Sequence, residues 1–339
     1  MPSPGGTMNA PVTIALDGMG GDRAPAEPVR GAIAAAREGV RILLVGDATT
    51  LAAELAAQGG APDGIAIVHA PDIVGSDEDG AKAVRAKPES SLVVACKLVA
   101  GGTAQGMMSP GNTGATLAAA TLYIRRLPGV IRPGIAAVLP SARGPVVLID
   151  AGANHESRSE YLQQFAVMGR LLARDVLLIP APRVGLLSIG EESGKGSELV
   201  QVTYAALEST EGFVGNVEGR DIPQGTVDVV VTDGFTGNVA LKLYEGAGAV
   251  MFSEIKSVLR TSLRGKLGGL LARPAIRRLR AKFDVDEYGG AYLLGVRGIV
   301  VIGHGNASGY AIANAIRLCA RGVQGHLVER VEAGLAPPS

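Results

Sequence analysis

Short apolar runs that end in glycine-rich polar turns recur along this 339-residue chain. The six turns are built from Gly, Asn, Asp and Ser, and they span residues 17–22, 109–114, 150–154, 190–197, 233–238 and 303–309. Continuous apolar runs are typical of strands covered on both faces, and their alternation with small-residue helical segments predicts a mostly parallel sheet. Because ligands bind at the carboxyl ends of such strands, we expect the turns to bind a ligand, and backbone N–H groups beside glycine suit an anion.

The same pattern predicts the order of the elements. Strands are expected at residues 12–16, 41–45, 65–69, 106–109, 135–139, 146–149, 184–189, 227–232 and 299–302. Helical spacing predicts helices at 26–38, 49–58, 113–124, 160–172, 197–207 and 310–321. With 47% hydrophobic residues, the chain is able to bury a large core in one or two lobes. We expect one α/β domain over residues 11–331, with loose tails at 1–10 and 332–339.

Composition excludes several classes of function. The formal net charge is zero, tryptophan is absent and aromatic residues make up 4% of the chain, so nucleic acid is not an expected partner. Cys96 and Cys319 lie in apolar helical patterns without CxxC spacing, which predicts buried, reduced thiols. The first ten residues do not resemble a signal peptide, and no apolar run is long enough to cross a bilayer. We therefore expect a cytoplasmic protein.

One segment, residues 255–283, carries basic charge without any acidic residue. Its nine basic residues are Lys256, Arg260, Arg264, Lys266, Arg273, Arg277, Arg278, Arg280 and Lys282. Apolar residues recur between them at near-helical spacing, and Gly268, Gly269 and Pro274 are expected to break the run into an amphipathic helical hairpin. Two interpretations stay open: a solvated helix pair packed on the core, or a basic face that meets anionic lipid or an acidic protein.

Two of the turns approach known nucleotide motifs without matching them. The turn at 303–309 reads GxGxxxG, and no acidic residue follows at the distance that a dinucleotide site requires. The stretch at 190–195 resembles a phosphate loop, but its glycine spacing is one residue short and Gly196 occupies the position of the magnesium-binding Ser or Thr. Neither turn predicts a dinucleotide or ATP site, and each one alone is also explained as a tight chain reversal.

Taken together, the turns and their flanking residues resemble a known family. The blocks are ALDGMGGDRAP from Ala15, SPGNTGA from Ser109, DAGAN from Asp150, RVGLLSIGEESGKG from Arg183, GNVEGRDI from Gly215, TDGFTGNVALK from Thr232 and YGGAYLLG from Tyr288. They are similar to the bacterial phosphate acyltransferases of phospholipid synthesis, and the resemblance covers residues 12–330. Pro110 replaces the usual Ala, Ser188 the usual Asn, and the stretch after His304 and Gly305 is looser than the family pattern.

The resemblance implies a reaction and an assembly. It implies transfer of a fatty acyl group from the thioester of acyl carrier protein to inorganic phosphate, which gives an acyl phosphate for glycerophospholipid synthesis. It also implies a homodimer with a three-layer α/β/α fold like that of isocitrate and isopropylmalate dehydrogenases, with a mostly parallel sheet. The protein would associate peripherally with the membrane surface, use no cofactor, and pass its product to a downstream glycerol-3-phosphate acyltransferase. The basic hairpin fits these partners because acyl carrier protein and the inner leaflet are both acidic.

To catalyse this transfer, an enzyme mainly has to position its two substrates and stabilise the developing negative charge. Phosphate is already a nucleophile and a thioester is already activated, so the enzyme has to join two substrates and stabilise an oxyanion. Lys195, in a glycine-flanked turn, is the leading candidate for binding phosphate, and Asn238 for donating to the thioester oxygen. His304 is a secondary catalytic candidate, as general acid toward the departing thiol, although such histidines are often structural.

Further residues are predicted to bind substrate or phosphate. They are Gly111, Asn112, Thr113, Gly114, Asn154, Gly194, Gly196, Asp233 and Gly237. A helix N-cap explains Asn112 and Thr113 almost as well. The aspartates Asp17, Asp22, Asp150 and Asp233 lack the spacing of metal ligands, so capping is expected and no metal site is predicted.

Two rival functions remain: a nicotinamide-dependent dehydrogenase of the same fold, or a non-catalytic anion-binding protein on the membrane surface. The acyl chain needs an apolar cleft near the dimer interface or against the hairpin, which the sequence does not locate.

Overall fold

The computed structural model describes residues 11–336, which form two compact units. Unit 1 consists of residues 11–125 and Arg297–Gly325, and unit 2 of Arg126–Val296 and residues 326–336. The expected N-terminal tail at 1–10 lies outside the described residues, as do 337–339.

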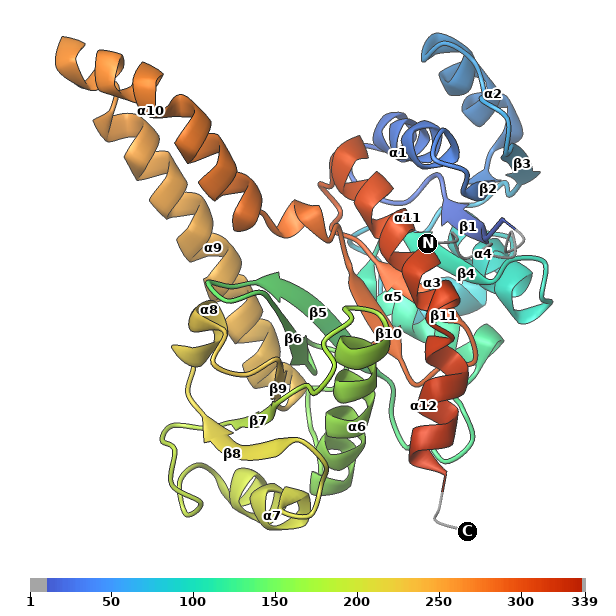
Figure 1. Ribbon diagram of the computed structural model, residues 1–339. Helices are drawn as coiled ribbons and strands as arrows, with labels where there is room; N and C mark the ends of the chain where they lie inside the picture. Colours follow the sequence, from blue (N-terminus) through green and yellow to red (C-terminus); the bar gives the residue numbers. More distant parts are fainter. Residues whose placement is uncertain (1–10, 337–339) are drawn as a thin grey trace, which may run out of the picture. The chain divides into compact units, whose positions relative to one another are not determined.

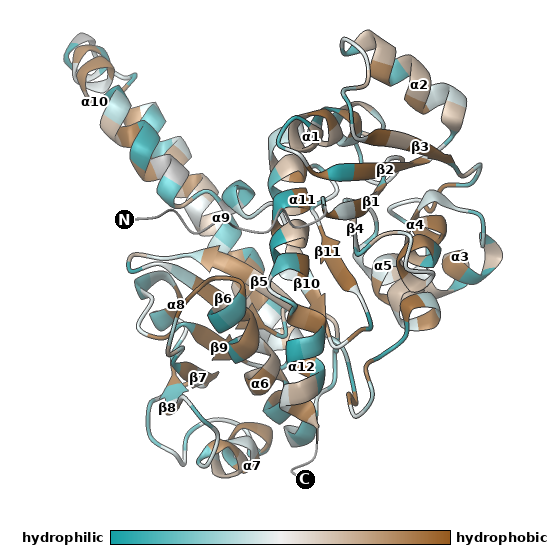
Figure 2. Ribbon diagram, turned by 45° about the vertical axis from the view of Figure 1, so that its right-hand side comes forward, coloured by the Kyte–Doolittle hydropathy of each residue, from teal (hydrophilic) through white to brown (hydrophobic). Residues whose placement is uncertain are grey.

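Unit 1 is built on five parallel strands. They are β1 (Thr13–Asp17), β2 (Arg41–Gly46), β3 (Ile65–His69), β4 (Gly106–Ser109) and β11 (Ile299–Ile302), in the order β3-β2-β1-β4-β11. The helices are α1 (Ala26–Ala36), α2 (Ala48–Ala57), α3 (Gly80–Ala86), α4 (Ser91–Ala100), α5 (Thr113–Ala119), the π-helical turn η1 (Ala120–Ile124) and α11 (Gly309–Gln324). The helices α1 and α11 pack on each other over one face of these strands, and α4 and α5 cover the other face (Figure 2). This is the predicted α/β arrangement.

Unit 2 has a mixed sheet. Its strands are β5 (Gly134–Pro140), β6 (Pro145–Ile149), β7 (Val184–Leu187), β8 (Phe213–Val217), β9 (Val229–Val231) and β10 (Ala291–Leu294), in the order β10-β5-β6-β9-β7-β8. The strand β5 is antiparallel to β10 and β6, whereas the pairs from β6 to β8 are parallel. The helices are α6 (Ser159–Asp175), α7 (Glu198–Leu207), α8 (Asp221–Gln224) and α12 (Leu327–Leu335). Phe165 and Leu172 of α6 are fully buried, and α7 and α12 pack on α6.

A long helical hairpin extends from the sheet of unit 2 (Figure 1). It consists of α9 (Gly234–Val258) and α10 (Leu263–Lys282), and the short 3₁₀ helix η2 (Val285–Glu287) follows. The helices are separated at residues 259–262, where Ser262 Oγ accepts a hydrogen bond of 2.9 Å from Gly265 N and caps α10. The predicted break at Gly268, Gly269 and Pro274 is therefore wrong, because these residues lie within α10.

The nine predicted strands are all present, with ends that shift by up to two residues. The strands β8 and β10 were not predicted. Gly215 interrupts the apolar run of β8, and β10 lies in the block YGGAYLLG, which was considered only for the family resemblance. The helix α12 continues to Leu335, into the segment expected as a C-terminal tail. Hydropathy colouring shows the strands of each unit as largely apolar, whereas α10 is mixed (Figure 2).

The two cysteines are buried and are not bonded to each other. Burial raises the pKa of both thiols, which keeps them protonated. Among residues 11–336, no helix is both long and apolar enough to cross a bilayer.

Candidate functional site

Three glycine turns of unit 2 meet at one edge of its sheet. The strands β6, β9 and β7 are parallel neighbours in that order. The turns 150–154, 232–238 and 188–197 follow their carboxyl ends. Because the carboxyl ends of parallel strands share an edge, Asn154, Asn238 and Lys195 are brought to the same edge of unit 2.

The buried Asp150 side chain holds the first of these turns. Its Oδ1 accepts hydrogen bonds from the N–H groups of Ile135 at 3.0 Å, Gly152 at 3.1 Å and Ala153 at 2.9 Å. Its Oδ2 accepts from Asn154 N at 2.8 Å and Asn154 Nδ2 at 2.9 Å. Burial raises the pKa of the Asp150 carboxyl, and these hydrogen bonds oppose that rise. A carboxylate surrounded by five N–H donors makes this turn rigid.

The first turn of α9 packs directly on the turn 150–154, which the Asp150 side chain holds. A Cβ atom on Gly237 would overlap with the Asp150 carbonyl oxygen, and one on Gly234 would overlap with the Asn154 carbonyl oxygen. Asp233 is the N-cap of α9, because its Oδ1 accepts a hydrogen bond of 2.9 Å from Thr236 N. The two glycines and Asp233 therefore place the start of α9, and the positive end of its dipole, against the turn.

Asn238 lies on the exposed side of this junction. Its Cβ lies beside Gly152, where an added Cβ would be 3.4 Å away. Within the described residues, the Asn238 amide makes no hydrogen bond, and the residue is exposed. Its Nδ2 group is therefore available to donate to a ligand.

The Lys195 turn is fixed through its backbone. Lys195 N donates to Glu192 O at 3.0 Å, and Gln201 Nε2 of α7 donates to the carbonyls of Gly194 at 3.0 Å and Gly196 at 3.2 Å. Gly196 has a φ of +96°, which favours glycine at this position. The Lys195 side chain is exposed and forms no ion pair within residues 11–336. A rigid turn thus presents an uncompensated ammonium group.

Two further polar residues at this edge were not predicted as site residues. Asn216 Nδ2 donates to Glu192 O at 2.8 Å, but its Oδ1 is buried without a hydrogen-bond partner in the described part of the chain. Ser188 Oγ is likewise buried and unpaired there, and a Cβ on Gly196 would lie 2.9 Å from it. Unsatisfied buried groups are rare outside functional or strained sites. Asn216 was missed because β8 was missed, and Ser188 was noted only as a departure from the family pattern.

A second group of turns lies within unit 1, at the carboxyl ends of β1, β4 and β11. Ser109 Oγ donates to Asp17 Oδ2 at 2.8 Å and accepts from Gly111 N at 3.1 Å. Asp22 N donates to Gly305 O at 2.7 Å, which joins the turns 17–22 and 303–309. Burial raises the pKa of Asp17. These hydrogen bonds tie the three turns to one another.

Of the residues of unit 1 that were predicted to bind phosphate, Asn112 has structural partners for its side chain. Asn112 is the N-cap of α5, since its Oδ1 accepts from Ala115 N at 2.9 Å. Its Nδ2 donates to the carbonyls of Ser76 at 3.1 Å and Glu78 at 2.9 Å. Thr113 and Gly114 are exposed in the first turn of α5, and His304 is half-buried in the turn 303–309.

The asparagine side chains thus differ in whether their amide groups already form hydrogen bonds with the protein. Like Asn112, Asn154 uses both amide hydrogens structurally, on Asp150 Oδ2 and on Pro133 O at 2.8 Å. Of the predicted polar residues in unit 2, Lys195 and Asn238 are the two whose side chains have no protein partner in the described part of the chain. The phosphate-binding roles of Asn112 and Asn154 stay predictions. In residues 11–336, no group of three or more His, Cys, Asp or Glu side chains is placed to hold a metal ion.

Comparison with known proteins gives a consistent result. The sequence model of a family described as fatty acid synthesis protein matches residues 12–330. The chain is 50% identical to a phosphate acyltransferase of Thermus thermophilus over 325 residues, which cover 95% of this chain and 98% of that protein. It is 46% identical to a phosphate acyltransferase of Elusimicrobium minutum over 326 residues, which cover 95% of this chain and 96% of the relative.

Solved structures with little sequence identity share the fold. A phosphotransacetylase from Streptococcus pyogenes superimposes with a TM-score of 0.63 at 17% identity, over 93% of this chain and 94% of that one. A 4-hydroxythreonine-4-phosphate dehydrogenase from Klebsiella pneumoniae gives a TM-score of 0.54 at 17% identity, over 94% of this chain and 100% of that one. At this identity the likeness concerns the fold alone, an α/β fold with mostly parallel strands.

Proposed function

The chain belongs to the fatty acid synthesis protein family, and on that premise we propose that it is an acyltransferase that moves a fatty acyl group from acyl carrier protein to inorganic phosphate. Family membership confirms the resemblance drawn from the sequence blocks. The relatives at 50% and 46% identity are phosphate acyltransferases, and the match to this chain covers nearly the whole length of each. The product is an acyl phosphate, which serves glycerophospholipid synthesis.

One structural observation supports this function most directly. The turns that carry Lys195 and Asn238 follow β7 and β9, which are adjacent parallel strands. Both side chains are exposed and lack protein partners among the described residues, while the residues around them are held by hydrogen bonds. A cation and an amide donor presented by rigid turns suit an anionic nucleophile and a carbonyl that becomes an oxyanion.

We propose the following roles. Lys195 Nζ binds a phosphate oxygen and offsets its charge as phosphate approaches the thioester. Another phosphate oxygen attacks the thioester carbon, and Asn238 Nδ2 donates to the oxygen that becomes negative. The carbon–sulfur bond then breaks, the electron pair leaves with the sulfur, and the mixed anhydride forms. No covalent intermediate with the protein is needed, because a thioester is already activated.

The remaining site residues have supporting or secondary roles in this proposal. Asp150 fixes the turn on which Asn238 rests, and the peptide groups of Gly194 and Gly196 hold the Lys195 turn. His304 is proposed as a proton donor to the departing thiolate. A thiolate is a good leaving group, since a thiol has a pKa near 8.5, so this contribution is expected to be small.

Assembly and location are proposals as well. The family implies a homodimer in the cytoplasm, associated peripherally with the membrane, and a three-layer fold like that of isopropylmalate dehydrogenase. The phosphotransacetylase and dehydrogenase likenesses support the α/β fold. The basic residues of α10 support contact with acidic surfaces, either acyl carrier protein or lipid. The downstream glycerol-3-phosphate acyltransferase is the proposed recipient of the acyl phosphate.

A single assay tests the function. The purified full-length protein is incubated with hexadecanoyl acyl carrier protein and radiolabelled orthophosphate, and the label in a lipid-soluble mixed anhydride is measured. Stoichiometric release of the free thiol together with labelled acyl phosphate is the expected result. Thioester consumption without label in the product would indicate hydrolysis instead. Activity that required a nicotinamide dinucleotide would favour the rival dehydrogenase function.

A further inference from the structure

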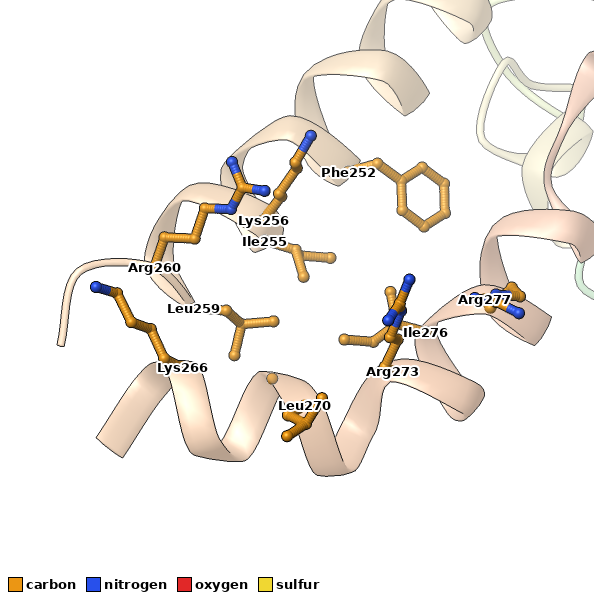
Figure 3. A pocket seen from close by; sticks show the side chains of 11 residues that line it. Phe252, Ile255, Lys256, Leu259, Arg260, Lys266, Leu270, Arg273, Ile276 and Arg277 are labelled. Atoms are coloured by element: carbon orange, nitrogen blue, oxygen red, sulfur yellow. The ribbon is translucent and has the colours of Figure 1, made fainter. Parts of the chain in front are cut away.

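The hairpin of unit 2 places apolar side chains between its two helices, with basic groups around them. Figure 3 shows Ile255, Leu259 and Ile276 directed into the space between α9 and α10. Among the described residues that line this space, none has a buried polar side-chain atom without a partner. Buried polar atoms that lack partners lie elsewhere in unit 2, around the turn that carries Lys195.

Three such atoms belong to the elements around the Lys195 turn. They are Ser188 Oγ at the start of the turn, Thr203 Oγ1 in α7, and Asn216 Oδ1 in β8, the strand beside β7. Each is buried and has no hydrogen-bond partner in the part of the chain that the structure describes. Because an unsatisfied buried polar atom costs free energy, such atoms are uncommon where a side chain serves stability alone.

Asn216 also bonds to the turn through its other polar atom. Its Nδ2 donates to Glu192 O at 2.8 Å. The same carbonyl oxygen accepts from Lys195 N at 3.0 Å, which closes a four-residue turn from Glu192 to Lys195. Asn216 therefore holds the carbonyl group that closes the turn on which Lys195 lies.

The direction of the Lys195 side chain depends on this turn. A Cβ on Gly190 would lie 3.1 Å from Lys195 Cγ and 3.5 Å from Lys195 Cδ, so the side chain passes close over Gly190. The start of the turn is tied to β8 as well, since Ser188 N donates to Val217 O at 2.8 Å. A shift of the Glu192 carbonyl would move Lys195 relative to Gly190, and the ammonium group would move with it.

Stability alone does not account for an asparagine at position 216. Without the Asn216 amide, Glu192 O would keep its hydrogen bond from Lys195 N, so this carbonyl would not be left unpaired. A leucine of similar size would also remove the unpaired Oδ1 from the interior. Asn216 thus contributes to the position of the turn more than to the free energy of unfolding.

We propose that Asn216 is a positioning residue for Lys195: its amide group fixes the Glu192 carbonyl and so holds the Lys195 ammonium group where phosphate binds. This proposal rests on the proposed function, in which Lys195 binds phosphate, and adds the residue that sets the position of that group. Asn216 acts through the turn and not by contact with a substrate.

The experiment compares Asn216→Leu with Thr203→Val in the full-length protein. Both substitutions remove a buried, unpaired polar atom, but the Thr203 side chain makes no hydrogen bond to the turn. Rates are measured with hexadecanoyl acyl carrier protein over a range of labelled orthophosphate concentrations. We expect Asn216→Leu to lower kcat/KM for phosphate about tenfold, mainly through KM, because a displaced ammonium group binds phosphate less well. Thr203→Val should keep wild-type activity, and both variants should melt at or above the wild-type temperature.

Two further measurements distinguish positioning from general damage to the fold. In a Lys195→Ala background, Asn216→Leu should cause no additional loss, because no ammonium group is left to position. Hydrogen exchange of the Lys195 amide, which donates to Glu192 O, should be faster in Asn216→Leu than in the wild type and unchanged in Thr203→Val. If the leucine variant does not fold, Asn216→Ala serves the same comparison, since alanine is too small to overpack the interior.

Three outcomes would overturn the proposal. The first is wild-type activity of the Asn216 variants, and the second is an equal loss of activity in the wild-type and Lys195→Ala backgrounds. The third is a loss of activity while the Lys195 amide exchanges at the wild-type rate. Wild-type protein that formed no labelled acyl phosphate would instead refute the proposed function, and the exchange measurement would still decide whether Asn216 holds the turn.

Discussion

The two units use the same kind of turn for different purposes. In unit 1, polar atoms of the turns bond to one another, as Asp17 does with Ser109 and Asp22 with Gly305. In unit 2, Asp150 and Asp233 supply the structural bonds, and Lys195 and Asn238 are left exposed beside them. A glycine turn therefore does not identify a reactive side chain by itself. What distinguishes the candidate site is a polar side chain without a partner on a turn that other residues hold.

The largest expected effect distinguishes the Lys195 ammonium from ordinary surface charge. We predict that Lys195→Ala lowers kcat/KM for phosphate about 10³-fold, because it removes the ammonium group that is proposed to bind the anion. The melting temperature should stay unchanged, since the side chain is exposed. Lys82→Ala, in unit 1, is the control, because the Lys82 side chain is 86% exposed and only pairs with Asp79. Equal activity of the two variants would remove Lys195 from the mechanism.

Each unit has a buried aspartate in a glycine turn, Asp150 in unit 2 and Asp17 in unit 1, and substitution of each one tests how much it contributes to stability. Asp150→Asn replaces one acceptor oxygen with a donor, which leaves at least two N–H groups of the turn unpaired. We expect the free energy of unfolding to fall by about 3 kcal/mol. Asp17→Asn should cost less than about 1 kcal/mol, because the Ser109 hydroxyl is able to reverse its role and accept. Urea denaturation measures both, and a larger loss for Asp17→Asn would contradict the contrast.

The third prediction concerns the oxyanion donor. Asn238→Ala is expected to lower kcat about 10²-fold with little change in KM for phosphate, because its amide acts on the transition state. Asn306→Ala removes a comparable exposed amide from the turn 303–309 of unit 1 and should leave kcat unchanged. Steady-state kinetics would exclude Asn238 from this role if activity stayed within threefold of the wild type.

Two glycines of unit 2 test whether the turns need glycine for the same reason. Gly237→Ala should lower the free energy of unfolding by about 2 kcal/mol, because the new methyl group would overlap with the Asp150 carbonyl. Gly194→Ala should be nearly neutral in stability, since nothing lies within 4 Å of its added Cβ. Thermal melts check both. A neutral Gly237→Ala would mean that the junction of α9 and the Asp150 turn is looser than described.

The smallest effect is expected at His304. His304→Ala should lower kcat about tenfold at most, because a thiolate leaves without much help from an acid. The loss should also disappear when the thioester carries a more acidic thiol. A drop of 10³-fold or more in fixed-time assays would contradict this prediction. It would show that His304 of the turn 303–309 is essential to the reaction.

Much of this architecture was predictable from sequence, and the failures have physical causes. Continuous apolar runs located nine strands, but Gly215 interrupts β8, and β10 directly follows the glycine pair Gly289 and Gly290. The hairpin was predicted, but its break was misplaced at Gly268, Gly269 and Pro274, which all lie within α10, whereas the two helices separate at residues 259–262. For the candidate site, Lys195 and Asn238 were chosen by residue type and turn, and both are exposed on turns that follow the neighbouring strands β7 and β9; their roles stay predictions. Sequence could not distinguish the amides of Asn112 and Asn154 from that of Asn238, since their partners come from distant residues such as Glu78 and Pro133.

The central claim is that Lys195 and Asn238 serve one site at the edge of unit 2. A crystal structure of the wild type soaked in orthophosphate tests it most directly. We predict phosphate density in contact with Lys195 Nζ, with Asn238 Nδ2 directed into the same cavity. Phosphate bound elsewhere, or Lys195 and Asn238 facing separate cavities with no density between them, would contradict the account.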